Sequence, residues 1–292
     1  MFEIPEDIFR RTPDGNEIGV LELAIGRVAG KSVATKQFHT RALKVVRTHY
    51  LDDSGQAYIT IVNPGGGYVG SDAYRISVDV TDGSSLLLTD QSATKVYRTP
   101  NNFVTQNIAF TVGDGAVLEY IPDQLILYKD ADYRQFLSAD VHPNGSLFVS
   151  DIVTPGWAPD GSQFRYEQAL LRTEVRVAGQ LEVLDNIRLR PMDEQFHANQ
   201  QFFMADRTHI STVICLDPNI SGDDIVEIRK LVASHSGGQA TVVGDVSATD
   251  RPGFVVRALS NRTEELLELT LAIANYVRAK TRNQGSIHLR KY

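Results

Sequence analysis

The sequence predicts a mainly β protein whose two helices are confined to the last third of the chain. Three observations indicate this class. Short runs of alternating apolar and polar residues recur from residue 17 to residue 206, which is typical of half-buried strands. Turn residues separate these runs, as at Asp82-Gly83, Asn144-Gly145 and Ala178-Gly179. Helical periodicity is seen only in the C-terminal part, residues 207–292.

The predicted strands follow one another without a helix between them. This spacing excludes a doubly wound fold and leaves a sandwich, a barrel or stacked sheets. No segment repeats at a fixed period, which argues against a regular propeller or solenoid. The predicted strands lie near residues 18–25, 32–47, 57–63, 73–80, 84–89, 103–112, 116–121, 124–128, 133–140, 146–154, 164–177, 180–190 and 201–206.

A first helix is predicted directly after Ser221. Its hydroxyl can cap a helix end, and the acidic residues of 222–224 suit the first turn. Apolar residues then recur on one helical face, and the glycine pair at 237–238 should end the helix by that point.

Two strands, at 240–246 and 254–259, and a second helix complete the C-terminal part. Asn261 with Glu264 three residues later resembles a capping box and starts a helix of about 18 residues. Its wide apolar surface packs either on its own domain or on a partner. The polar and basic residues 278–292 are expected to form a loose tail. We therefore expect a single domain over 1–292, with a β-rich body (17–206) and an α+β part (207–292).

Composition narrows the function classes. The formal net charge is −7 and no block of basic residues occurs, so neither nucleic acid nor a membrane is expected as a partner. Cys215 is the single cysteine, lies in an apolar run and is expected to be buried, which suits a reducing compartment. The N-terminus lacks the features of a signal peptide, and no apolar run approaches 18 residues. A cytoplasmic location is expected.

A glycine-rich loop at 63–72 matches the dinucleotide-binding pattern in spacing only. Gly65, Gly67 and Gly70 fit G-x-G-x-x-G, which binds a pyrophosphate when it leads from a strand into a helix. Here a strand precedes the loop, and the alternating residues 74–80 predict a second strand after it. The loop is therefore predicted to be a strand–loop–strand turn that binds no nucleotide.

Other catalytic and metal motifs fail the same kind of test. Gly30-Lys31-Ser32 resembles the end of a phosphate-binding loop, but Ile25 occupies the position of the first required glycine. The sequence has no G-x-S-x-G motif, and its seven histidines are scattered without metal-binding spacing. We expect no catalytic residues, no tightly bound cofactor and no tight metal site.

Two carboxylates are predicted to face the apolar side of their strands. Asp185 shares its parity with the apolar residues at 181, 183, 187 and 189, and Asp151 shares its parity with those at 147, 149 and 153. A buried carboxylate costs several kcal/mol unless it is paired or lines a wet cavity. Two interpretations stay open: a polar path through the interior, or a buried ion pair with Lys95, Arg98 or Arg188.

Five stretches in chain order resemble motifs of the urease accessory protein D family (UreD, also called UreH). The resemblance covers about residues 20–206 and is looser beyond them. Ser71 departs from the pattern, because the family has glycine there. The stretches are the proline–glycine loop at 63–72, Ala-Thr-Lys-Val-Tyr-Arg at 93–98, Glu-Tyr-Ile-Pro within 118–128, Asp-Ile-Val-Thr-Pro-Gly-Trp at 151–157 and Leu-Asp-Asn at 184–186.

The resemblance implies a β-rich fold with helically stacked sheets and two helices. It also implies a non-enzymatic chaperone that binds apo-urease and accessory protein F and, through F, the GTPase accessory protein G. Nickel would be held transiently on its way to urease. Positions that match the family's functional polar residues are Asp72, Thr94, Lys95, Asp151 and Asp185. As a hypothesis, Asp151 and Asp185 line the nickel path, and Asp72 fixes the glycine loop or its mouth.

Two alternatives from other classes remain. A β-rich hydrolase would need two carboxylic acids that converge in an open cleft. A ligand-binding β module would need exposed aromatic side chains, for which Trp157 and some tyrosines are the candidates.

Overall fold

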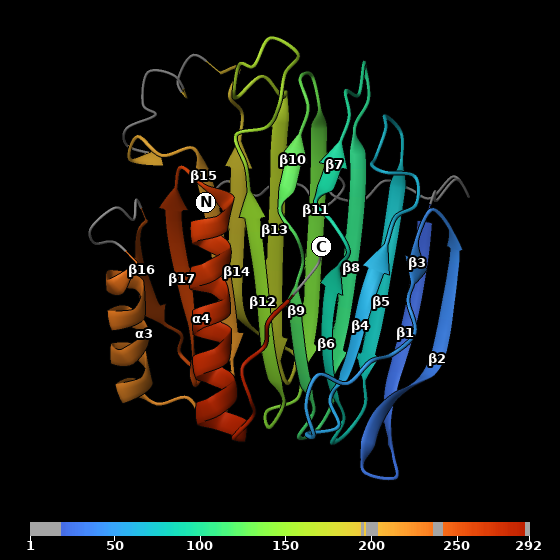
Figure 1. Ribbon diagram of the computed structural model, residues 1–292, viewed down its shortest axis with the longest axis vertical. Helices are drawn as coiled ribbons and strands as arrows, with labels where there is room; N and C mark the ends of the chain where they lie inside the picture. Colours follow the sequence, from blue (N-terminus) through green and yellow to red (C-terminus); the bar gives the residue numbers. More distant parts are fainter. Residues whose placement is uncertain (1–18, 194–195, 197–203, 236–241, 290–292) are drawn as a thin grey trace.

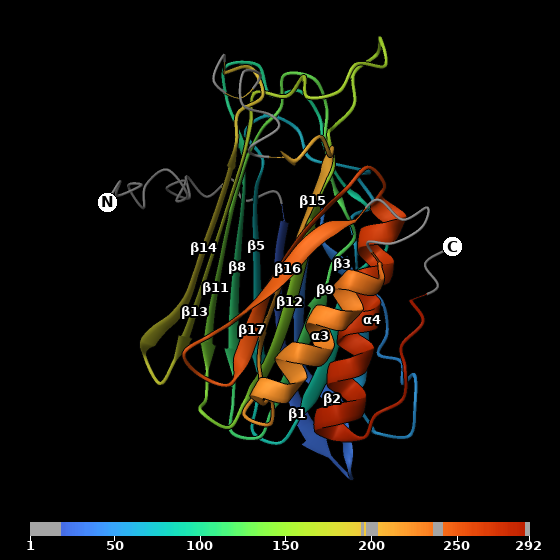
Figure 2. The same ribbon diagram turned by 90° about the vertical axis from the view of Figure 1, so that its left-hand side faces the viewer.

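Two β-sheets lie face to face in the computed structural model, and two helices cover the outer face of one of them (Figure 1, Figure 2). The structure describes residues 19–193, 196, 204–235 and 242–289. Sheet A has the strand order β14-β13-β11-β8-β5-β1-β2. Its strands are β1 (Gly19–Val28), β2 (Lys31–Arg41), β5 (Ala73–Val80), β8 (Val104–Val112), β11 (Asp132–Val141), β13 (Gln168–Val177) and β14 (Gln180–Leu189).

Sheet B has the order β16-β17-β15-β12-β9-β6-β4-β3, and the short strands β7 and β10 pair beside it. Its strands are β3 (Lys44–Val45), β4 (Ala57–Val62), β6 (Ser85–Asp90), β7 (Thr94–Val96), β9 (Val117–Ile121), β10 (Leu125–Leu127), β12 (Ser146–Val153), β15 (His209–Leu216), β16 (Val243–Ala248) and β17 (Gly253–Ser260).

Successive long strands from β4 to β13 alternate between the two sheets. Each sheet therefore receives every second long strand, and neighbours within this part of a sheet are parallel. The turns at Asp82-Gly83 and Asn144-Gly145 lead from sheet A into sheet B. The chain advances along the molecule as a solenoid-like coil, in agreement with the stacking that the family resemblance implied (Figure 1). A solenoid-like coil was not expected from the sequence, because alternation of strands rather than a repeated residue pattern specifies each of its turns.

Two apolar cores form on either side of sheet B. One lies between the sheets, and the other lies between sheet B and the helices. The central part of sheet B is thus buried on both faces, and strands such as β6, β9 and β15 are nearly continuous runs of buried residues. This explains why β15 was missed: its residues 209–216 are almost all buried and do not alternate. Cys215 is buried in this strand, as predicted.

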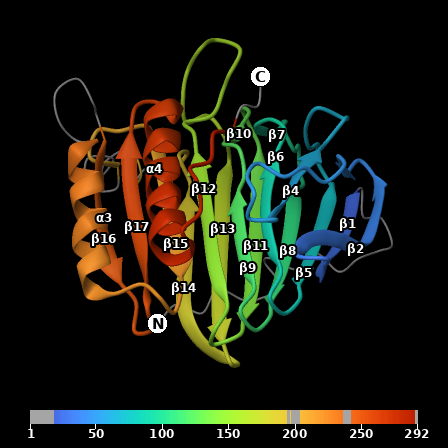
Figure 3. The ribbon, with the colours of Figure 1, turned by 60° about the horizontal axis from the view of Figure 1, so that its bottom comes forward.

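The helices α3 (Gly222–Ser234) and α4 (Thr263–Arg282) pack over the β15–β17 end of sheet B (Figure 3). Ser221 occupies the N-cap position of α3 as predicted, and both its backbone N–H, at 2.8 Å, and its hydroxyl donate to the Asp224 carboxylate. Helix α4 begins after Arg262, and the structure shows no capping hydrogen bond from that side chain. Its apolar face packs on its own domain. None of the helices in the described ranges has the length and apolar composition needed to cross a membrane.

Several predicted boundaries need correction. The strand predicted at 32–47 is divided into β2 and β3, and the one predicted at 164–177 begins at residue 168. The strand predicted at 201–206 lies partly outside the described residues, and residues 204–206 are not a strand. The predicted glycine stop at 237–238 and the residues at 240–241 also lie outside them.

The prediction of a loose C-terminal tail was wrong for its described part. Helix α4 continues to Arg282, and Arg278 is buried. The chain then folds back, so that the Ile287 N–H donates to Asn275 Oδ1 at 2.7 Å and the Ile287 side chain is buried. The positive charges had suggested solvent exposure, but those of Arg278 and Arg282 belong to a buried ionic cluster that is described below.

Candidate functional site

The glycine loop (residues 63–72) crosses from β4 in sheet B to β5 in sheet A. A strand follows it, as predicted, so no helix N-terminus faces the glycines. Within the loop, the Tyr68 N–H donates to the Lys95 carbonyl at 2.8 Å, and the Tyr97 N–H donates to the Tyr68 carbonyl at 2.8 Å. The loop is therefore joined by backbone hydrogen bonds to the segment that contains Thr94 and Lys95.

Close packing explains why the loop needs glycine at position 67. A Cβ atom added there would lie 2.6 Å from the Tyr97 ring and 2.9 Å from the Lys95 carbonyl oxygen. Gly70 is similarly close to Thr99, at 3.2 Å from its Cα atom. The glycines let two backbone segments approach each other, and they do not form a phosphate cradle.

Asp72 holds this loop in place. Its side chain is buried, and Oδ2 accepts hydrogen bonds from the Val69 N–H at 2.9 Å and from the Tyr74 hydroxyl at 3.0 Å. Burial and the Asp72 carboxylate raise the pKa of Tyr74, so its hydroxyl stays protonated and can donate. This geometry supports the hypothesis that Asp72 fixes the glycine loop.

A cavity of about 40 Å³ lies beneath the glycine loop, with room for roughly one to three water molecules. Both sheets contribute to its wall. Polar residues that line it include Asn63, Asp90, Thr94, Lys95 and Gln106.

Tyrosine side chains lie next to this cavity, farther into the space between the two sheets. The Tyr68 ring stacks on Tyr74 with centroids 3.7 Å apart, and it lies 6.5 Å from the Tyr133 ring. The Tyr133 hydroxyl is 2.8 Å from Gln106 Oε1 and 2.9 Å from Gln135 Oε1. Burial, reinforced by nearby carboxylates, raises the pKa of Tyr133, so that it is a neutral hydroxyl at physiological pH.

Asp151 of β12 is the next polar group. Gln135 Nε2 of β11 donates to its Oδ1 at 3.3 Å, which joins the two sheets. Burial raises the pKa of Asp151 to about 7, and the negative charges of Asp185 and Asp90 add to this effect. The Gln135 hydrogen bond and the Arg257 charge oppose it. The inward orientation predicted from strand parity is confirmed.

Asp185 of β14 faces the interior and is paired with Arg257 of β17, whose Nη2 donates to its Oδ1. The partner differs from the three candidates Lys95, Arg98 and Arg188. Sequence reasoning missed Arg257 because β17 and β14 belong to different sheets and are 72 residues apart at this contact.

Thr212 lies between Asp151 and Arg257 in sheet B. Cα registers pair Asp151 with Thr212 and Thr212 with Arg257, so the three side chains share the inner face. Thr212 is buried, and its Oγ1 has no hydrogen-bond partner among the described residues.

We call this row of side chains between the sheets the polar interior. Hydrogen bonds join Asp72 to Tyr74, Tyr133 to Gln135, Gln135 to Asp151, and Arg257 to Asp185. The rings of Tyr74, Tyr68 and Tyr133 lie beside one another, and the charge of Asp185 acts on Asp151. Arg257 also lines a cleft of about 470 Å³ at the far end. The five predicted residues do not form one cluster: Asp72, Thr94 and Lys95 lie at the loop end, and Asp151 and Asp185 lie toward the cleft. Within the described ranges, no three His, Cys, Asp or Glu side chains are arranged to hold a metal ion.

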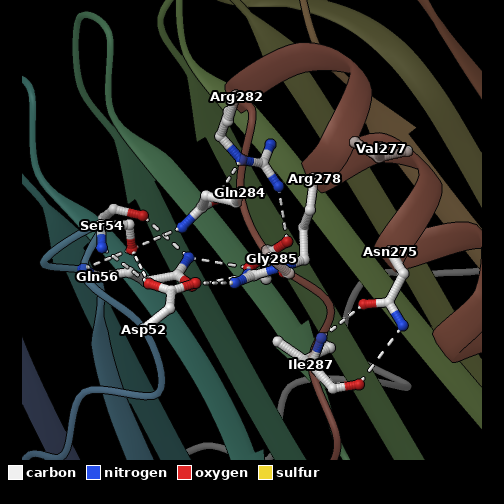
Figure 4. Close-up of polar contacts among 12 residues, drawn as sticks. Asp52, Ser54, Gln56, Asn275, Val277, Arg278, Arg282, Gln284, Gly285 and Ile287 are labelled. Atoms are coloured by element: carbon white, nitrogen blue, oxygen red, sulfur yellow. Dashed lines mark hydrogen bonds and ion pairs between the residues drawn. The ribbon is translucent and has the colours of Figure 1, made fainter.

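A second buried polar group, on the helix side of sheet B, was not anticipated. Glu119 of β9 accepts hydrogen bonds from Arg278 Nη1 and, at 2.7 Å, from Arg282 Nη2 of α4. Figure 4 shows Arg278 also reaching Asp52 and Gln56, at 3.2 and 2.7 Å. The signal that could have revealed it is a glutamate within the strongly apolar strand of residues 117–121.

Comparison with known proteins supports the motif resemblance over almost the whole chain. The family model described as UreD urease accessory protein matches residues 17–290. The chain belongs to the UreD family. Similar proteins include the urease accessory protein UreD of Paenarthrobacter aurescens (strain TC1), which is 40% identical over 96% of this chain and 97% of its own length.

Two further relatives show the same extent of similarity. The urease accessory protein UreD of Arthrobacter sp. (strain FB24) is 42% identical over 94% of each chain. That of Corynebacterium glutamicum (strain ATCC 13032) is 41% identical over 94% of this chain and 98% of its own. These relatives are named as accessory proteins rather than as enzymes, and membership of the UreD family supports a role in urease maturation.

Proposed function

We propose that this protein is a urease-maturation chaperone that passes nickel along its polar interior to apo-urease. In this proposal it binds accessory protein F and, through F, the GTPase accessory protein G, and it acts in the cytoplasm as a non-enzymatic scaffold. The observation that carries the nickel route is the row of polar and tyrosine side chains between the two sheets, from the glycine loop to the cleft, in a chain of the UreD family.

The chemistry of the polar interior suits transient binding. Its groups are carboxylates, hydroxyls and amides, and such oxygen ligands hold Ni²⁺ more weakly than imidazole or thiolate does. A passage needs sites that are weak enough to release the ion. Because the pKa of Asp151 is about 7, nickel would compete with a proton there, and binding would release that proton.

The two alternative classes receive less support. A hydrolase would need free acids in an open cleft, but Asp185 is paired with Arg257 and Asp151 accepts a hydrogen bond from Gln135. For a ligand-binding module, Trp157 is about half exposed but packs against Tyr128, with ring centroids 5.1 Å apart.

Substitution of Asp151 tests the proposal in cells that produce urease with all its accessory proteins. Asp151→Asn keeps the shape of the side chain and removes its negative charge, so we expect a several-fold lower nickel content of purified urease. The complex with F and G should still assemble, as measured by co-purification. The matched control is Asp140→Asn, at an exposed position of β11 in the facing sheet. This variant should leave the nickel content of urease unchanged.

Normal nickel loading with Asp151→Asn would contradict the nickel route. Loss of the complex with F and G would instead indicate that Asp151 is needed for the fold or for assembly.

A further inference from the structure

The ion pair between Asp185 and Arg257 spans the two sheets where they open toward the cleft. Asp185 comes from β14, the edge strand of sheet A, and Arg257 comes from β17, next to the edge strand of sheet B. The Asp185 side chain is 17% exposed and that of Arg257 is 39% exposed. The pair therefore lies at the boundary between the polar interior and the cleft.

Inside this boundary the interior carries negative charge. The carboxylates of Asp185 and Asp90 lie close enough to Asp151 to add to the effect of burial on its pKa. The positive charge of Arg257 has the opposite effect and lowers the pKa of Asp151. Its guanidinium thus occupies a position beside Asp185 where a cation is electrostatically favoured.

Outside the boundary the cleft carries positive charge. Arg188 and Arg190 line it together with Arg257, on an apolar floor that includes Ile187 and Ile210. Asp193 is the acidic residue among the lining side chains and forms an ion pair with Arg190, with a separation of 3.5 Å. Two of these three arginines are paired with carboxylates, so the described wall has a small excess of positive charge, which disfavours the entry of a divalent cation only weakly.

Thr212 supplies an independent observation at this place. Its buried Oγ1 lies on the inner face between Asp151 and Arg257 without a hydrogen-bond partner in the described part of the chain. A buried hydroxyl without a partner costs stability. A bound cation would use Thr212 Oγ1 as a neutral ligand beside the carboxylates of Asp151 and Asp185.

We propose that Arg257 is the gate of the polar interior at its cleft end. While it is paired with Asp185, its guanidinium takes the place of a divalent cation. When it moves aside, Asp185, Thr212 and Asp151 become available as oxygen ligands. This inference rests on the proposed nickel route and assigns its control to one residue.

Nickel binding by the isolated full-length protein tests the gate by isothermal titration calorimetry with Ni²⁺ alone. Arg257→Met removes the charge and keeps most of the length, so it should lower the dissociation constant about tenfold or more, because a like charge beside the ion is lost. Arg257→Gln should act in the same direction, which guards against a folding defect in one variant. Arg229→Met, which breaks an exposed ion pair with Asp245 on the helix side of sheet B, should bind as the native protein does.

The double variant Arg257→Met/Asp185→Asn identifies the ligand. It should lose the gain in affinity, because the carboxylate that Arg257 covers is gone. Native-like affinity of both single Arg257 variants would overturn the gate, and so would a gain that persists without Asp185. Failure of the nickel route itself is seen separately, as normal urease nickel content with Asp151→Asn.

Discussion

At the scale of single residues, Asp151 is held in the polar interior with a pKa near neutrality. Burial is the main cause, and the carboxylates of Asp185 and Asp90 add to it. A carboxyl group with this pKa exchanges its proton under cellular conditions. The positive charge of Arg257 lowers this pKa, so Asp151 is anionic to a larger extent while a cation lies near it.

The raised pKa has a consequence for stability. The pKa of Asp151 is about 7 in the folded protein, against an ordinary value of 3.8, so the folded state holds this proton more tightly than the unfolded chain does. The proton on Asp151 contributes fully to the stability of the fold below pH 3.8. This contribution is lost as the pH rises through the folded pKa of about 7. The Gln135 hydrogen bond and the charges of Asp185, Asp90 and Arg257 act on Asp151, and the charge of Asp151 in turn acts on Tyr120 and Tyr133.

We therefore expect Asp151→Asn to change stability in a pH-dependent way. One pKa unit corresponds to about 1.4 kcal/mol. From pH 5 to pH 8, the free energy of unfolding of the variant should therefore rise by roughly 1–3 kcal/mol relative to that of the native protein. Urea unfolding of both proteins at the two pH values measures this difference. The same difference at both pH values would show that Asp151 has an ordinary pKa.

At the scale of elements, the glycine loop and β7 form one unit. Backbone hydrogen bonds join Tyr68 to Lys95 and Tyr97, and Gly67 permits this close approach. The two family motifs that contain Asp72 and Thr94 are thus packed against each other at one end of the polar interior. A change in the packing of the loop should move both.

Gly67→Ala tests this unit. The added methyl group would overlap the Tyr97 ring and the Lys95 carbonyl, so we expect a loss of about 1–3 kcal/mol in the free energy of unfolding, as is usual for overpacking. Gly65→Ala in the same loop is the control, because its Cβ atom would lie no closer than 3.1 Å to any neighbour, and it should cost less. Chemical denaturation compares the two variants. Equal stability of the Gly67 variant and the native protein would show that the loop can move away without cost.

At the scale of the whole molecule, the second core attaches the C-terminal helix to the solenoid-like body. Glu119 accepts hydrogen bonds from both Arg278 and Arg282, and Arg278 is also held by the Gly285 carbonyl at 3.0 Å. Helix α4 is thereby tied to the loop that precedes β4 (Figure 4). Removal of one partner from such a buried cluster leaves uncompensated charge.

Glu119→Ala should therefore destabilise the protein by about 3–5 kcal/mol, because two buried or nearly buried arginines lose their shared carboxylate. The control is Glu227→Ala, which breaks the exposed ion pair with Lys230 on α3 and should cost less than about 1 kcal/mol. Unfolding in urea measures both. Similar costs for the two variants would mean that the buried cluster contributes no more than a surface pair.

The sequence by itself determined the local features of this protein. Alternation predicted most strands, the strand after the glycine loop excluded a nucleotide site, and parity placed Asp151 and Asp185 on inner faces. These are properties of neighbouring residues, which share one stretch of backbone. Motif order then indicated the family.

The tertiary structure alone decided which distant groups meet. Arg257 rather than Lys95, Arg98 or Arg188 pairs with Asp185, and Glu119 rather than solvent receives the arginines of α4. Strand β15, buried on both faces, showed no alternation to be recognised. The physical reason is that the alternation of strands between two sheets brings together residues far apart in the chain, and no local pattern records which of them lie opposite each other.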